Sequence, residues 1–190
     1  MTEELTLDQS HVYRLGDRRV PGFTEICQNL GVIEPNGFYT EDGRRQGTAL
    51  SDWLLFLASG KVADQEPEPE IAGRVEGIRK FLSDTKFVFV AGEVPQYDPV
   101  LNFVTRPDIW GHIGSFSCVV EAKRGAKMGF HFLQTAAEKI ALAANGFQAQ
   151  KRYCLYLRDG DYRLEEHANR DDERNWRAIV AAFHAKAQYT

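Results

Sequence analysis

The first strong hydrophobic periodicity along the chain lies between Thr48 and Gly60. Apolar side chains recur there every three or four positions, which is the spacing of one helix face. Thr48 is suited to the N-cap of such a helix, and Gly60 is suited to its end. The pattern therefore predicts a largely buried helix. Its apolar face consists of Leu50, Trp53, Leu54 and Leu57.

Three later segments, residues 71–82, 130–146 and 173–187, show the same helical spacing, and a shorter helix is expected from Thr24 to Leu30. The acidic, proline-containing residues 61–70 predict a solvated loop. The predicted apolar stripes consist of Ile71, Val75, Ile78, Phe81 and Leu82, then of Phe132, Ala136, Ile140, Ala143 and Ala144, and then of Trp176, Ile179, Val180 and Phe183.

Shorter β-branched and aromatic runs predict strands over residues 86–97, 101–113 and 118–123. Three consecutive strands suggest a meander. Residues 152–167 contain two further runs joined at Asp159 and Gly160, which is a strong hairpin signal. Strands alternating with helices predict an α/β or α+β fold, with a central mixed β-sheet flanked by helices.

The composition fits one domain over residues 1–190, because 43% of the residues are hydrophobic and the chain is long enough to bury a core. The N-terminal segment before the first long helix reads as an irregular cap. A formal net charge of −4 means that a nucleic-acid partner would need a local basic surface or a bound metal.

The chain lacks the patterns of secreted and membrane proteins. It has three widely spaced cysteines, which suit buried free thiols in a reducing cytoplasm better than a disulfide scaffold. The polar, acidic first residues do not resemble a signal peptide, and no apolar run approaches the about 20 residues that a bilayer requires. We therefore expect a cytoplasmic protein without membrane contact.

Charged residues end one of the predicted strands, where a buried run would be expected to stay apolar. Residues two apart in a strand point to the same side, so Glu121 and Lys123 share one face while Ala122 points to the other. The glycine-containing turn that follows places both charges at an end of the sheet, where a cleft can open. Asp108 reaches the same opening if the neighbouring strands pair as a meander.

Two carboxylates and an ammonium group are costly to gather in one cleft unless a cation shares the negative charge. Carboxylate and carbonyl oxygens suit Mg²⁺, with Mn²⁺ as a substitute, and the Ala122 carbonyl would supply a further oxygen. Such a metal acidifies bound water and polarises a phosphoryl oxygen, while Lys123 orients the water or stabilises the developing charge. This pattern points to phosphodiester hydrolysis, with Asp108 and Glu121 as metal ligands.

Pro107 and Asp108, followed one strand later by Glu121, Ala122 and Lys123, look like a known signature. With these residues the chain resembles the PD-(D/E)xK nuclease superfamily, in particular its RecB-type and phage exonuclease branch. The match to the signature is complete.

Further residues extend this resemblance over about Val20 to Leu157. Gln134, on the next predicted helix, stands at the position of that branch's characteristic glutamine, and Glu93 looks like its additional acidic residue. The stretches VPGFTEICQNLG and RRQGTALSDWL are similar to the branch's short helix and its glycine-containing helix start.

The resemblance implies a restriction-endonuclease-like core and a metal-dependent DNA nuclease. It implies that Asp108 and Glu121 bind Mg²⁺ with the help of Glu93, that Lys123 acts on the attacking water, and that Gln134 supports the site. Exonuclease action on DNA ends, in a phage or recombination role, is what this branch implies. A helicase or recombination protein, or further copies of the chain, would be the protein partner.

Two positions depart from the family pattern. Ser51 stands where many members carry a metal-binding histidine, and Glu138 stands where the glutamine motif often has a tyrosine four residues on. The acid and lysine set is nevertheless intact. The alternative is a nuclease fold kept as a catalytically inactive nucleic-acid-binding or assembly module.

Several polar residues near the signature admit two interpretations. Ser51 either contacts the substrate or is an ordinary polar residue on a helix. Glu93 either serves the metal site, or caps a turn or pairs with a nearby arginine. Arg124, Lys127 and His131 either bind phosphates or form a solvated charged face.

Overall fold

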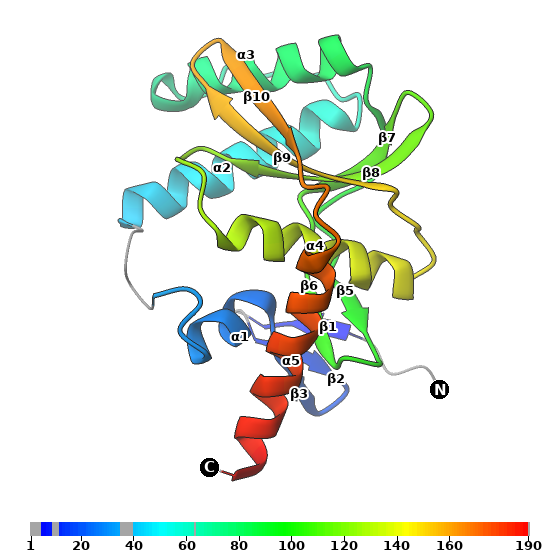
Figure 1. Ribbon diagram of the computed structural model, residues 1–190. Helices are drawn as coiled ribbons and strands as arrows, with labels where there is room; N and C mark the ends of the chain where they lie inside the picture. Colours follow the sequence, from blue (N-terminus) through cyan, green and yellow to red (C-terminus); the bar gives the residue numbers. More distant parts are fainter. Residues whose placement is uncertain (1–4, 9–11, 35–39, 63, 190) are drawn as a thin grey trace.

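A computed structural model describes residues 5–8, 12–34, 40–62 and 64–189 of the chain. At its centre lies a five-stranded sheet with the strand order β10-β9-β8-β7-β4 (Figure 1). Strands β8 and β9 are parallel and the other neighbours are antiparallel, so the predicted mixed sheet is confirmed. The strands are β4 (Val88–Ala91), β7 (Ile109–Ile113), β8 (Phe116–Lys123), β9 (Lys151–Arg158) and β10 (Asp161–Glu166).

Helices lie on both faces of this sheet. Helices α2 (Glu41–Ala58) and α3 (Pro69–Thr85) cover one face, and α4 (Phe130–Ala144) covers the other (Figure 1). Helix α4 is also the crossover that joins the parallel strands β8 and β9, as parallel pairing requires. The chain is thus a mixed α/β protein, and none of its described helices is both long and apolar enough to span a bilayer.

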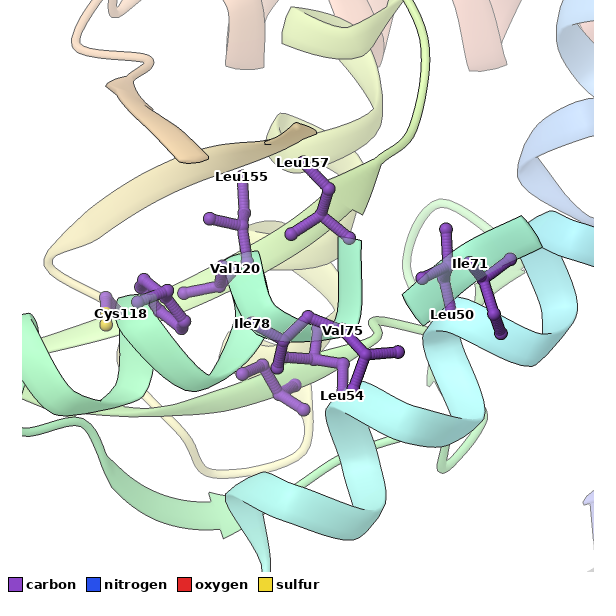
Figure 2. Packing of buried hydrophobic residues seen from close by; sticks show 11 residues of the cluster. Leu50, Leu54, Ile71, Val75, Ile78, Cys118, Val120, Leu155 and Leu157 are labelled. Atoms are coloured by element: carbon purple, nitrogen blue, oxygen red, sulfur yellow. The ribbon is translucent and has the colours of Figure 1, made fainter. Parts of the chain in front are cut away.

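The main hydrophobic core fills the space between the sheet and the helices α2 and α3. Figure 2 shows side chains of both helices meeting residues of β8 and β9. Helix α3 approaches the β9–β10 turn closely, because a Cβ atom at Gly77 would lie 2.4 Å from the carbonyl oxygen of Asp161. The core residues include Leu50, Leu54, Val75, Ile78, Val120 and Leu155.

A second core lies on the far side of α4, around Trp176 of α5 (Asp171–Tyr189). Its indole packs on Phe23 and Phe103, with ring centroids 5.0 and 5.2 Å away. The N-terminal segment contributes more regular structure than the predicted irregular cap, because three short strands form a sheet of their own. The elements of this layer are β1 (Leu5–Leu7), β2 (Tyr13–Leu15), β3 (Arg18–Val20), α1 (Phe23–Asn29), β5 (Gln96–Asp98) and β6 (Phe103–Thr105).

The predicted meander is present as β4-β7-β8, but two of its predicted strands are divided. Residues 86–97 form β4 and then β5, and residues 101–113 form β6 and then β7. Strands β5 and β6 form a separate two-stranded sheet outside the main sheet. Pro107 lies at the break, because a proline has no amide hydrogen to donate to a sheet ladder.

The predicted start of the first long helix was wrong. Helix α2 begins at Glu41, and the Thr40 hydroxyl caps it by accepting a hydrogen bond of 3.0 Å from the Gly43 amide. Its first two turns are largely exposed, so they show no hydrophobic periodicity. The described residues omit parts of the predicted N-terminal cap and of the predicted loop over residues 61–70. In α4, Ala144 of the predicted apolar stripe is exposed.

Candidate metal and catalytic site

Asp108 and Glu121 lie side by side at one end of the central sheet. Ile109 of β7 pairs with Val120 of β8, so Asp108 directly precedes and Glu121 directly follows this pair. Both side chains are buried, with 7% and 5% of their surface exposed. The backbone amide of Ala122 donates a hydrogen bond of 2.7 Å to Asp108 Oδ2 and holds that carboxylate in place.

Lys123 and Gln134 hold one oxygen of the Glu121 carboxylate. The Lys123 ammonium donates to Glu121 Oε1 over 2.7 Å and to Gln134 Oε1 over 3.0 Å. The Gln134 amide nitrogen donates to the same Glu121 Oε1 over 2.6 Å. Gln134 faces the strand end from the second turn of α4, which is where the sequence placed it. The three side chains form a closed triangle of hydrogen bonds.

Ser51 of α2 completes the surroundings of Asp108. Its hydroxyl donates a hydrogen bond of 3.1 Å to Asp108 Oδ1, so both oxygens of this carboxylate have a donor within the protein. Ser51 therefore lies beside the candidate metal ligand, and its hydroxyl is directed at that carboxylate. From the sequence, Ser51 was either a substrate contact or an ordinary polar residue on a helix.

Glu93 reaches the site from the turn between β4 and β5. Its φ of 55° lies in the left-handed region, which costs a non-glycine residue about 1–2 kcal/mol, and its amide donates to the Pro107 carbonyl over 2.9 Å. Strained residues of this kind cluster at functional sites. Arg106 Nε pairs with Glu93 Oε2 at 2.7 Å, so the arginine partner considered from the sequence is present.

The electrostatics of the site favour a bound cation. Burial and the Glu121 carboxylate raise the pKa of Asp108 well above its ordinary value, and Lys123 only partly opposes them. Burial also raises the pKa of Glu93, against the attraction of Arg106. Burial disfavours the charge on Lys123, but the carboxylates of Glu121 and Asp108 outweigh it and raise the pKa of this ammonium.

Glu138, which the sequence marked only as a departure from a family pattern, is part of this cluster. Its side chain is 0% exposed and, within the described residues, its carboxyl group is in hydrogen-bonding reach of the Glu121 carboxylate and of no amide, hydroxyl or ammonium group. Burial and the neighbouring Glu121 carboxylate raise its pKa well above the ordinary value. The sequence held one signal for its burial. Glu138 lies one helical turn after Gln134 and therefore on the same side of α4, which faces the sheet.

The three basic residues after β8 differ in their surroundings. Arg124 donates to Gln46 Oε1 over 3.0 Å, and the exposed Lys127 pairs with Glu165. His131 is only 3% exposed, and burial lowers its pKa to about 3, so its ring is neutral. His131 therefore offers a phosphate neither charge nor exposed surface in this structure, because α4 turns the ring inward toward Tyr156, whose hydroxyl lies 3.2 Å away.

The residues present fit a magnesium ion that keeps most of its water. In the described part of the chain no three histidine, cysteine or acidic side chains gather as a full metal cage. Mg²⁺ rarely uses such a cage and is usually held by one or two carboxylates together with substrate phosphates. Glu121 Oε2 receives no hydrogen bond from an amide, hydroxyl or ammonium group of the described residues, and the Glu138 carboxyl lies within hydrogen-bonding reach of the Glu121 carboxylate. The acids thus gather negative charge beside Asp108 that such an ion would offset. Asp108 and Glu121 would hold it, with Glu93 nearby.

The proposed function is based on the geometry of the site, because comparison with known proteins found no match. No protein-family model matches the chain, and no curated protein matches it in sequence.

Proposed function

We propose that the chain is a metal-dependent DNA nuclease with a restriction-endonuclease-like core, of the RecB-type and phage exonuclease kind. The observation that supports this most strongly is the cluster of Asp108, Glu121, Lys123 and Gln134 at the ends of adjoining strands. An ordinary solvated strand end would leave these side chains exposed. Here Asp108 and Glu121 are buried, Lys123 and Gln134 are partly buried, and Glu121, Lys123 and Gln134 are hydrogen-bonded to one another.

The chemistry follows from the position of each group. A bound Mg²⁺ supplies an acidified water and polarises the phosphoryl oxygen. Lys123 stabilises the negative charge that develops on the phosphate oxygens during in-line attack by water. Gln134 fixes the Lys123 ammonium, and Ser51 and the Ala122 amide fix Asp108, so that the ligand set is oriented before substrate arrives.

A second candidate, an inactive nuclease fold that binds DNA or assembles with other proteins, is supported by the pairing within the site. Lys123 and Glu121 already form an ion pair across 2.7 Å. The buried Glu138 adds a further acid that forms no ion pair with a described residue. Such a cluster would also persist as a structural remnant. The two candidates differ in whether the protein cleaves DNA, which an activity assay decides.

The experiment is cleavage of end-labelled linear and closed circular DNA, single- and double-stranded, with Mg²⁺, Mn²⁺ or EDTA. We expect metal-dependent loss of linear DNA only, reduced at least about 100-fold in Lys123→Met and Glu121→Gln. Lys151→Met is the matched control, because Lys151 also pairs with a carboxylate but lies at the opposite end of the β8–β9 pair.

Each remaining outcome decides between the candidates. Cutting of circles would assign an endonuclease. Folded protein that cleaves no DNA with any metal would refute the nuclease proposal, and would leave the inactive module. An equal loss of activity in Lys151→Met would show that the effect comes from general destabilisation and not from the site.

A further inference from the structure

A cavity of about 380 Å³ opens beside the candidate site, on the side of the N-terminal strands. Its walls combine aromatic, cationic and amide side chains, which is the usual make-up of a pocket that binds a small polar ligand. The volume lies in the range of such pockets. Tyr13, Phe23, Thr105, Arg106 and Gln134 form most of its lining.

The fold places Tyr13 in this wall through contacts between distant segments. Gly22 forms a bridge to Val104, and the Val104 amide donates to the Pro21 carbonyl over 2.9 Å. These contacts fasten the N-terminal strands to β6. The Tyr13 ring lies against Gly22, where an added Cβ atom would come within 3.3 Å of the ring. Tyr13 is therefore a supported wall of the cavity.

Two of the lining residues also belong to the candidate site. Gln134 holds Glu121 and Lys123 on one side and lines the cavity on the other. Arg106 pairs with Glu93 through its Nε atom, and its side chain is 41% exposed. A ligand in the cavity would therefore lie next to a phosphate held at the candidate metal site.

We propose that this cavity is a subsite for an unstacked nucleobase of a single-stranded DNA end, adjacent to the phosphate that is cut. The inference rests on the proposed nuclease function. The base packs on the Tyr13 ring, and Arg106 contacts the neighbouring phosphate. A base held in a duplex is stacked on both faces and paired, so it would have to leave the helix to enter the cavity. The subsite thus selects single-stranded ends.

A second hollow of about 480 Å³, between α2 and the segment after it, fits this role less well. It has the aromatic side chains of Trp53 and Phe56, but the carboxylates of Asp52 and Asp64 also line it. Acidic side chains repel the phosphates that accompany every base. The cavity beside Arg106 is also lined by one carboxylate, that of Glu25, but this group is paired with Arg19 at 2.9 Å, so the charge of the lining still favours this cavity.

The test compares cleavage, and binding in Ca²⁺, of two single-stranded oligonucleotides that differ by one abasic position next to the terminal phosphodiester. We expect the wild type to bind the intact end about 5- to 150-fold more tightly, as one stacked base predicts. Tyr13→Leu should lose this preference, and Tyr13→Phe should keep it. Tyr189→Leu is the control, because Tyr189 is 87% exposed near the chain end.

The outcomes separate this proposal from the proposed function. If the wild type cuts both oligonucleotides equally well, or cuts blunt duplexes as fast as single strands, the subsite is refuted and the nuclease stands. If it cuts nothing but binds the intact end more tightly, the nuclease is refuted, and with it the role of the cavity beside a cut phosphate; only binding of an unstacked base remains. Neither cleavage nor a binding preference would overturn both. The abasic comparison uses the wild-type chain, so it remains decisive even if Tyr13→Leu fails to fold.

Discussion

The buried Glu138 carboxyl allows a quantitative test of the electrostatics of the site. It lies within hydrogen-bonding reach of the Glu121 carboxylate, and no amide, hydroxyl or ammonium group of the described residues bonds to its oxygens. Glu138→Gln keeps the shape of the side chain and removes its charge. The new amide can donate to the Glu121 carboxylate at every pH, whereas the Glu138 carboxyl can do so only when it is protonated. We expect the variant to be more stable than the wild type at neutral pH.

The direction of the expected effect follows from proton linkage. Burial and the Glu121 carboxylate raise the pKa of Glu138 above its ordinary value of 4.5 in the folded chain. At a pH between the unfolded and folded pKa values, the folded state therefore binds more protons than the unfolded state. The contribution of this group to stability is full below pH 4.5 and is lost as the pH rises through the folded pKa. For one proton the unfolding free energy falls by about 1.4 kcal/mol per pH unit in this range.

The assay is urea unfolding of both proteins from pH 4 to pH 8 in EDTA, followed by the intrinsic fluorescence of the three tryptophans. The difference in unfolding free energy should be small near pH 4.5 and should grow in favour of Glu138→Gln by about 1.4 kcal/mol per pH unit above it. Glu76→Gln is the control, because Glu76 is 61% exposed and should show a difference within about 0.5 kcal/mol. Parallel curves for Glu138→Gln and the wild type would refute the reasoning.

Two further substitutions test other parts of the structure. Glu93→Asn should raise the unfolding free energy by about 1 kcal/mol, because asparagine tolerates a positive φ. It should also reduce metal-dependent cleavage, because the half-buried carboxylate is lost. A lower stability in urea would contradict the first expectation. Arg152→Met should cost about 3–5 kcal/mol in the same urea assay, because it leaves the buried Asp172 without its 2.9 Å partner. The exposed Arg174→Met is its control, and equal losses in both would refute a special role for the buried pair.

Helices and turns that are marked by short-range sequence patterns were predictable from the sequence. The apolar stripe over residues 71–82 identified α3, since four of its five predicted core positions are buried and the fifth, Leu82, is partly buried. The Asp159 and Gly160 turn identified the β9–β10 hairpin, and Gly160 has the positive φ of 67° that favours glycine. Helical periodicity and turn chemistry depend on neighbouring residues, so they need no tertiary contact.

The candidate site was predictable to the extent that it follows strand geometry. Alternation along β8 put Glu121 and Lys123 on one face, and antiparallel pairing brought Asp108 beside them. The positions of Glu93 and Gln134 came from a family pattern and from no local signal. The burial of His131 was not predictable, because a histidine would be ordinary on a solvated helix face. The position of Glu138 one helical turn after Gln134 was the one signal for its burial.

The sequence by itself therefore determined the helices with apolar stripes, the hairpin and the charged end of β8, because periodicity and turn chemistry act over a few residues. Only the tertiary structure decided that β5 and β6 leave the central sheet, that Glu138 is buried against Glu121, and that Tyr13 meets Arg106. These features depend on strand register and on packing between segments far apart in the chain. Long-range contacts of this kind are set by the whole core at once, and no short window of sequence carries them.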